Sequence, residues 1–214
     1  MRRLTFIACM SLCLAGQAAE MREALIGGQV SMGVDTSGKL TSCGITFAAV
    51  EAVKDADLKG PLTVFNGSFV LYSLSGGLLK GRIGSWNPKD AQGKGFNLNQ
   101  VKPLPTTKFW FKAQGSAATA PQAGTGMFPS EDDPGYVLYA APLKSTFAVA
   151  AAIENDESIQ IGLQAKGDKS AKVLFGKVLL SDSEREQYTN CLNEWVDTQK
   201  ALLDATGSGA TKSK

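Results

Sequence analysis

The sequence contains no histidine among its 214 residues, and this absence closes several chemistries. A Ser-His-Asp triad, a Cys-His dyad, a histidine-ligated zinc site and a histidine-bound haem all need an imidazole. The chain is also poor in cysteine, with four, and in tryptophan, with three. Its 22 basic and 20 acidic residues leave a net charge of +2, too small for the positive field of a nucleic-acid-binding protein. We expect no cofactor, no metal and no nucleic-acid partner.

The first 18 residues have the three-part pattern of a secretory signal peptide. Two arginines at the start supply positive charge, residues 4–16 are mostly apolar, and Gly16 and Ala18 provide the small side chains that precede a cleavage site. An apolar helix of 13 residues would rise only about 20 Å, short of the roughly 30 Å core of a bilayer. The pattern therefore predicts cleavage after Ala18 and not a membrane anchor.

Cleavage at that point defines the compartment and the charge of the mature chain. Gln17 stands where a lipoprotein signal would place a cysteine, so we expect an unlipidated periplasmic or secreted protein. The signal removes two arginines and no acid, which leaves 20 basic and 20 acidic residues and a net charge of zero. No later stretch approaches eighteen consecutive apolar residues, so the mature chain is expected to lack a transmembrane segment.

Only two cysteines remain in the mature chain, because Cys9 and Cys13 leave with the signal. In an oxidising compartment a lone pair of cysteines favours a disulfide, here between Cys43 and Cys191. The bond would close a loop of 191 − 43 = 148 residues. In the chain-entropy model a closure of that size stabilises the fold by roughly 5 kcal/mol.

Local patterns place both thiols toward an interior. Residues 40–51 alternate with period two, so Cys43 falls on the apolar face of a strand. Cys191 falls in the apolar stripe of a helix. The other members of that stripe are Tyr188, Leu192, Trp195, Leu202 and Leu203. A helix packed on the sheet would bring the two sulfurs together.

The mature chain has the pattern of a single mainly-β domain, 19–205, followed by a flexible tail, 206–214. Short apolar and β-branched runs alternate with turn residues, which is typical of antiparallel strands. The predicted strands are 29–34, 40–50, 62–74, 78–86, 96–101, 106–113, 136–141, 144–153, 158–166 and 171–180. We expect about eight or nine of these to form an antiparallel β-sandwich or partly open barrel, while the small, uncharged segment 114–126 forms a flexible loop. One amphipathic helix, 182–205, is predicted after a capping box of Ser181 and Glu184.

Two acidic segments invite a catalytic or cation-binding interpretation. Residues 55–60 (DADLKG) resemble the start of an EF-hand loop, but Lys59 occupies a ligand position and Asn66 stands where the bidentate glutamate belongs. Three carboxylates crowd together at Glu131, Asp132 and Asp133, between two prolines. Such a cluster can bind a cation or raise the pKa of one member, but an exposed acidic turn is the plainer expectation.

The segment 108–112 (KFWFK) is the best candidate for a binding surface. In a strand its two phenylalanines face the core, while Lys108, Trp110 and Lys112 face the other way. A tryptophan between two lysines, with Trp86 as a possible neighbour, suits stacking on a sugar ring or on an aromatic side chain of a partner. The alternative is that Trp110 packs beneath the loop that follows Ala113.

Taken together, these features favour an exported, non-enzymatic β-domain that binds a partner protein or a cell-envelope component. The partner would be another envelope or secreted protein, or a glycan. One alternative is a small extracytoplasmic hydrolase that uses carboxylates such as those of the acidic turn. Another is a subunit of an envelope or secretion assembly, with the final helix or segment 114–126 docking a neighbour.

Overall fold

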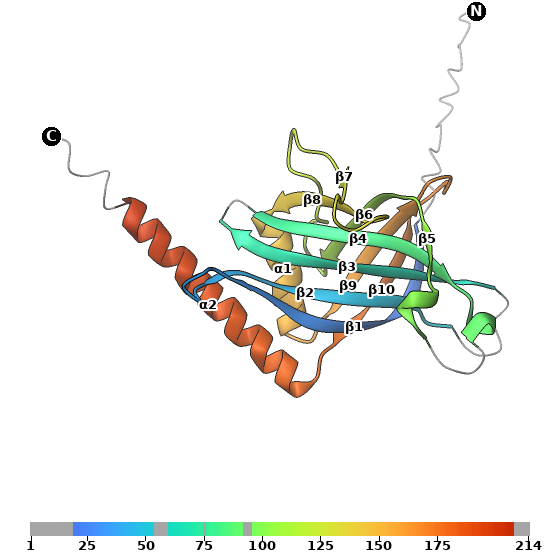
Figure 1. Ribbon diagram of the computed structural model, residues 1–214, viewed down its shortest axis with the longest axis horizontal. Helices are drawn as coiled ribbons and strands as arrows, with labels where there is room; N and C mark the ends of the chain where they lie inside the picture. Colours follow the sequence, from blue (N-terminus) through green and yellow to red (C-terminus); the bar gives the residue numbers. More distant parts are fainter. Residues whose placement is uncertain (1–18, 54–59, 75, 92–95, 208–214) are drawn as a thin grey trace, which may run out of the picture.

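The computed structural model describes residues 19–53, 60–74, 76–91 and 96–207. The predicted signal peptide, and the tail from residue 208, lie outside these ranges. Within them the chain forms ten strands and two α-helices (Figure 1). The strands are β1 (Glu20–Val34), β2 (Leu40–Glu51), β3 (Leu62–Ser73), β4 (Gly76–Trp86), β5 (Lys102–Leu104), β6 (Thr106–Ala113), β7 (Phe128–Pro129), β8 (Val137–Pro142), β9 (Ser158–Ala165) and β10 (Lys172–Leu179). The helices are α1 (Leu143–Glu154) and α2 (Asp182–Gly207).

All ten strands belong to one sheet, which confirms the mainly-β prediction. Their order is β6-β9-β10-β1-β2-β3-β4-β8-β7, and β5 pairs with β4 off this path. The pairing is antiparallel except between β1 and β10, which run parallel, so the expectation of a wholly antiparallel sheet was wrong at this position. β1 also begins nine residues before the predicted start at 29, because its first half pairs with β10 and its second half with β2.

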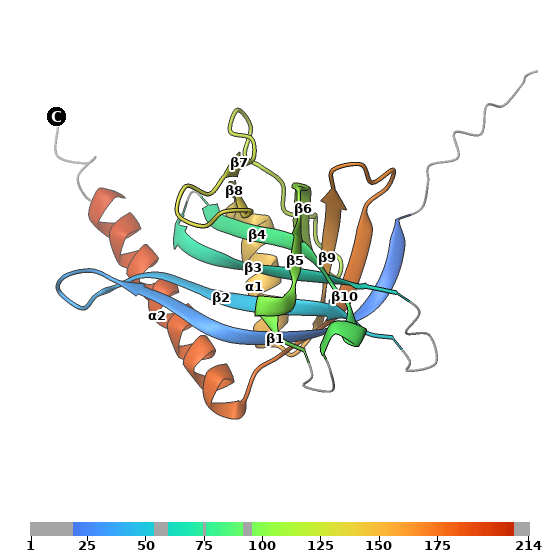
Figure 2. The same cartoon turned by 45° about the vertical axis from the view of Figure 1, so that its right-hand side comes forward.

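The sheet curves until its two ends face each other, but it is not closed (Figures 1 and 2). We call β6, β9 and β10 the first limb, and β2, β3, β4 and β8 the second limb. Rings from β6 meet rings from the second limb: Phe111 lies 5.2 Å from Phe47, and Phe109 lies 5.4 Å from Phe65 and 5.1 Å from Tyr139, centroid to centroid. These aromatic side chains fill the space between the limbs.

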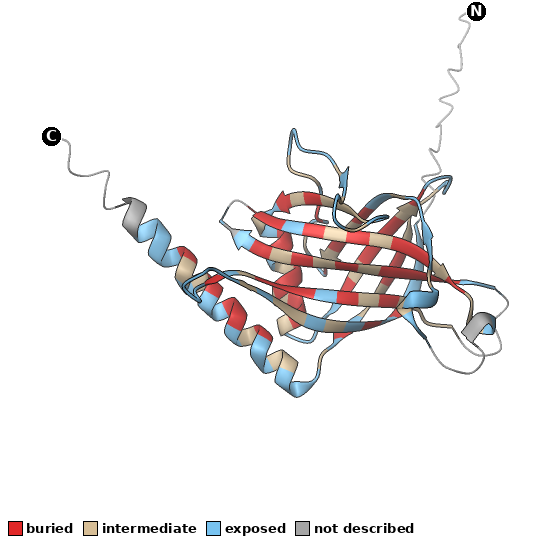
Figure 3. Cartoon of the chain, in the orientation of Figure 1, coloured by how far each residue is buried: buried red, intermediate tan, exposed pale blue. Residues whose placement is uncertain are grey.

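Burial alternates along the strands as period-two packing requires (Figure 3). On β2 the predicted inner residues Cys43, Ile45 and Phe47 are buried, whereas Thr46 on the other side is exposed. The longer strands thus have an inner face that lines the core and an outer face that is more accessible, whereas the short strands β5 and β7 are exposed throughout.

Segment 114–126 is a loop without helix or strand, as predicted, and hydrogen bonds join it to both β6 and β8. Thr119 is 2% exposed and exchanges two hydrogen bonds of 2.8 Å with the backbone of Phe111 on β6. Its hydroxyl also lies 2.9 Å from the hydroxyl of Tyr139 on β8. A little further on, Gln122 N–H donates to the carbonyl of Ala140, again at 2.8 Å. We call this set of bonds the seam.

Helix α1 occupies residues that the sequence pattern assigned to a strand, 144–153. Alternation of Phe147, Val149, Ala151 and Ile153 suggested the strand, but Phe147 is 38% exposed and the buried set recurs at helical spacing. The buried residues are Ser145, Thr146, Val149, Ala150, Ala152 and Ile153. Small side chains at several of these positions let α1 lie between the two limbs, in contact with β3, β4, β6, β8 and β9.

Helix α2 packs across β2 and β1 and also touches α1. Ser181 and Glu184 form the predicted capping box: Ser181 N–H donates to Glu184 Oε2 at 2.8 Å, and Glu184 N–H donates to Ser181 Oγ at 3.3 Å. The helix ends at Gly207, two residues beyond the prediction. Its buried stripe is shorter than predicted, because Leu202 and Leu203 are 49% and 53% exposed. Neither described helix combines the length and apolar character of a membrane span.

The segment between β4 and β6 also differs from the prediction. Residues 96–101 were expected to form a strand, but Leu98–Gln100 form a single 3₁₀ turn, capped by the Asn97 side chain, which accepts from the Asn99 N–H. A short strand, β5, follows directly and pairs with the end of β4. Pro103 within β5 and Pro105 directly after it restrict how far this strand extends.

Candidate binding surface

Trp110 lies on the outer face of β6, opposite Gly162 of β9. Its neighbours Phe109 and Phe111 are fully buried on the inner face, as the alternation predicts. A Cβ atom added to Gly162 would clash with the Trp110 indole. The closest ring atom would be Cε2, followed by Cζ2 and Nε1, which are both bonded to Cε2. A Cβ atom above the ring plane at Cε2 is nearest to Cε2 itself, as here. A Cβ atom in the ring plane, on the outer side of Cε2, would instead be nearer to Cζ2 and Nε1. The indole therefore lies face down on Gly162.

The other face of the indole is turned away from the sheet, and the side chain is half-buried. The alternative, in which the loop after Ala113 covers Trp110, has no support from the bonds of that loop. Ser116 Oγ donates to the carbonyl of Ala113, and Thr119 turns to Phe111 and Tyr139 at the seam. Only a glycine at 162 gives the indole room to lie this close to the strand.

Four long polar side chains surround the indole on the same face. Lys108 pairs in register with Gln164, and Lys112 pairs with Gln160. Of the ion pairs formed within the described ranges, none involves Lys108 or Lys112. We call these side chains, with Trp110 and Gly162, the Trp110 face.

Beyond β9 the outer face gains apolar side chains. Val173 of β10 stands opposite Gly162, and Met21 of β1 stands opposite Val173. Val173 is buried, whereas Met21 is 54% exposed. A hollow of about 360 Å³ follows on β10 and β1, and its lining combines the apolar Phe175 and Leu179 with the charged Glu23 and Lys177. The outer face of the first limb thus has a cationic, aromatic half and a half in which apolar and charged side chains are mixed.

Trp86, the remaining member of the predicted surface, lies elsewhere. It is 8% exposed and belongs to a small separate cluster with Leu62 and Val64 on the outer face of the second limb. Phe96 packs against it edge to face, with the ring centroids 5.2 Å apart. The structure therefore brings Trp110, Lys108 and Lys112 together and places Trp86 in the packing beneath the segment after β4.

The acidic turn docks onto the outer face of β4. Asp133 forms an ion pair with Lys80, while Glu131 and Asp132 are exposed. Among the described residues no three acidic or cysteine side chains gather as metal ligands would. The EF-hand-like residues 55–59 lie outside the described residues. The turn thus has the geometry of a structural contact, with one carboxylate neutralised by a lysine.

A polar cluster beside this turn was not predicted. Tyr136 donates to the side-chain oxygen of Asn66, and the guanidinium of Arg82 lies 4.7 Å from the centre of the Tyr136 ring. Lys80 lies 5.2 Å from the same ring centre. The cluster borders a hollow of only about 170 Å³. In the sequence its one signal is polar residues at alternate positions of two central strands, where cross-strand partners meet.

Two tyrosines are buried in the interior, and burial changes the pKa of each hydroxyl. Burial raises the pKa of Tyr139, although its hydrogen bond with Thr119 acts the other way. Burial also raises the pKa of Tyr188, and the nearby charge of Glu154 adds to the effect. Both hydroxyls therefore stay protonated near neutral pH and act as structural hydrogen-bonding groups.

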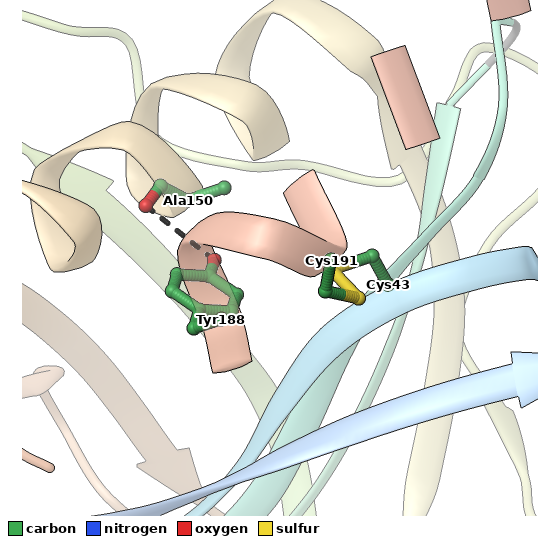
Figure 4. Close-up of a disulfide and its surroundings, with 4 residues drawn as sticks. All are labelled: Cys43, Ala150, Tyr188 and Cys191. Atoms are coloured by element: carbon green, nitrogen blue, oxygen red, sulfur yellow. Dashed lines mark hydrogen bonds between the residues drawn. A yellow bond between two sulfur atoms is a disulfide. The ribbon is translucent and has the colours of Figure 1, made fainter. Parts of the chain in front are cut away.

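Cys43 and Cys191 form a disulfide that joins β2 to α2, as the sequence predicts (Figure 4). Their Cα atoms are 5.8 Å apart, and both side chains are buried. One turn earlier in the helix, the hydroxyl of Tyr188 donates to the carbonyl of Ala150 in α1 at 3.4 Å. The disulfide is attached to β2, which is distant in the sheet order from β6 and β9 of the Trp110 face. It therefore stabilises the scaffold without forming part of that face.

Comparison of the chain with protein-family models, with curated proteins and with solved structures finds no match.

Proposed function

We propose that the mature protein is an exported, non-enzymatic β-domain that binds a partner protein or a cell-envelope component through the Trp110 face. Export is supported by the signal-peptide pattern of residues 1–18, and a disulfide between Cys43 and Cys191 is compatible with an oxidising compartment. A binding role is supported by the half-buried aromatic ring of Trp110 and by two lysines on the same strand that form no ion pair within the described ranges.

The observation that carries the proposal is the position of the indole. A tryptophan normally buries most of its surface, and its exposed part is a large apolar area that water solvates poorly. Because Gly162 has no side chain, the ring lies directly on the sheet. The indole is therefore held in place and needs little further ordering on binding. A pre-organised aromatic side chain of this kind suits recognition.

The proposal is tested by crosslinking in the native envelope followed by purification of the protein with whatever it has captured. We expect the wild type to retain a specific component and Trp110→Ala to lose it while the near-ultraviolet circular dichroism of the core remains. Phe128→Ala is the matched control, because it removes another aromatic side chain, 49% exposed, from a strand outside this face. Equal capture by all three proteins would refute the proposal.

Export has its own measurement. Protein recovered from its natural host should have the intact mass of residues 19–214 less two hydrogens for one disulfide. A full-length mass with every thiol open to alkylation would contradict the export part of the proposal and leave the binding part to the crosslinking result.

A further inference from the structure

We infer that the ligand of the Trp110 face is an anionic polysaccharide, one of whose sugar rings stacks on the indole while its acid groups lie against Lys108 and Lys112. The inference rests on the proposed function, because it names the class of ligand for the same surface. It concerns carboxylate-bearing and sulfate-bearing chains alike, since both present the same charge to a lysine.

The indole supplies a surface for a sugar ring. One side of a pyranose ring is lined with C–H groups that carry small positive charges, and the face of an aromatic ring carries negative charge. The two surfaces are both flat and of similar extent, so they pack without a pocket. Because one face of Trp110 lies on Gly162, the opposite face is the one that a sugar ring would cover.

The cations are spaced for a chain and not for a single sugar. Lys108 and Lys112 are four residues apart on one strand, which places their Cα atoms about 14 Å from each other with Trp110 midway. Acid groups on sugars before and after the stacked ring would reach one lysine each. The amides of Gln160 and Gln164 stand beside the two lysines and offer both donors and acceptors to hydroxyl groups.

The surrounding charges agree with an anionic ligand. Lys166, exposed directly after β9, adds a third cation at the Lys108 end, and Asp168 follows it in the β9–β10 turn. Asp168 uses one oxygen to accept from the Ala165 N–H at 2.9 Å, and its own backbone carbonyl accepts from Gln164. Asp168 thus has a structural role in the β9–β10 turn, and among the described residues it forms no ion pair with Lys108 or Lys112.

A protein partner fits this half of the face less well. Lysine is depleted at the centre of protein–protein interfaces, and the strongest contacts there are anchors that fill desolvated pockets. On the Trp110 face, flexible polar side chains surround a flat ring.

The test measures binding of the mature protein to three polymers of matched length: dextran sulfate, polygalacturonate and neutral dextran. We expect both anionic polymers to bind, neutral dextran to bind at least tenfold more weakly, and added salt to weaken the anionic complexes. Trp110→Ala and Gly162→Ala should each reduce affinity at least tenfold, the second because its methyl group lifts the indole off the strand. The double variant Lys108→Gln/Lys112→Gln should lose both affinity and most of the salt dependence.

Lys39→Gln/Lys200→Gln is the matched control, because it removes the same charge from two exposed lysines on a hairpin turn and on α2. Affinity unchanged by Trp110→Ala, equal binding of neutral dextran, or an equal loss in this control would overturn the inference. If no polymer binds and yet Trp110→Ala loses its envelope component, the ligand is of another class and only the inference fails. If the envelope capture is also independent of Trp110, the proposed function fails with it.

Discussion

The two helices are held to the same sheet in different ways. Helix α1 lies between the limbs, has no side-chain cap at Pro142, and is surrounded by five strands. Helix α2 lies outside, is capped by Ser181 and Glu184, and is tied to β2 by a disulfide. An enclosed helix is fixed by the packing around it, whereas a peripheral helix with one buried stripe needs additional attachment. The comparison separates what stabilises the core of this protein from what stabilises its edge.

The largest effect should come from removing the attachment of α2. Replacing Cys43 and Cys191 by serine opens a loop of 148 residues and should lower the free energy of unfolding by up to about 5 kcal/mol. The measurement is the denaturant midpoint under oxidising conditions. Dithiothreitol should lower the midpoint of the wild type toward that of the double variant and leave the variant unchanged. A wild-type midpoint that does not respond to reductant would show that α2 is held by packing alone.

A second prediction concerns the place where the two helices meet. Tyr188 is fully buried between them, so Tyr188→Ala should cost about 3–5 kcal/mol through the cavity that it leaves. Tyr188→Phe removes only the long bond to Ala150 and should cost about 1 kcal/mol. Leu202→Ala, at an exposed position of the same helix, should change stability by less than about 0.5 kcal/mol. Equal melting temperatures for Tyr188→Ala and Leu202→Ala would refute the contact between α1 and α2.

The hydrogen bonds of the seam, which join segment 114–126 to β6 and β8, can also be tested by comparing a buried with an exposed position. Thr119→Val leaves the buried Phe111 N–H without its acceptor and deprives Tyr139 of a partner, so it should cost about 1–3 kcal/mol. Thr125→Val is the control, because the hydrogen bond that its hydroxyl donates to the carbonyl of Gln122 lies on the surface. Hydrogen exchange at the Phe111 amide should accelerate in the first variant and stay slow in the second. Slow exchange in both would show that segment 114–126 does not bridge the limbs.

The sequence was sufficient for the elements whose signals are local. Helix α2 has a capping box and an apolar stripe, and most strands have period-two alternation between turn residues, so both could be predicted from nearby residues. Helix α1 was missed because its buried side includes Ser145 and Thr146, which a search for hydrophobic residues does not count, while apolar residues also fall at alternate positions along 147–153. A signal was nevertheless present, since an alanine-rich run directly after Pro142 favours a helix.

The features that could not be predicted depend on residues distant in the sequence. Glycine at 162 has no meaning for binding until strand pairing places it beneath Trp110. The role of Thr119 likewise requires knowing that β6 ends the curved sheet on one side and that β8 is next to its last strand on the other. Alternation predicted correctly that Trp110 faces away from the core, but it could not fix the orientation of the ring or the separate location of Trp86.

The smallest predicted effect is a dependence on pH at the residue that links both helices. Asp156 follows α1 and accepts from Lys177 of β10 at 2.8 Å and from Arg185 of α2 at 3.0 Å. The hydrogen bond from Lys177, opposed in part by desolvation and assisted by the charges of Lys177 and Arg185, lowers the pKa of Asp156 below its ordinary value of 3.8. Because the folded state holds the ionised form, its contribution to stability is complete above the unfolded pKa and is lost as the pH falls through the folded one.

Asp156→Asn should therefore lower the denaturant midpoint slightly at about pH 7, and the difference from the wild type should shrink as the pH falls through the folded pKa of Asp156 and the carboxyl takes up a proton. Asparagine tolerates the positive φ of 56° at this position, so the substitution tests the charge and not the backbone. Glu157→Gln is the control, because it removes a neighbouring exposed charge. A difference between wild type and Asp156→Asn that persists at low pH would mean that the carboxylate does not link α1 to α2 and β10, and that packing and the disulfide are sufficient to hold the peripheral helix.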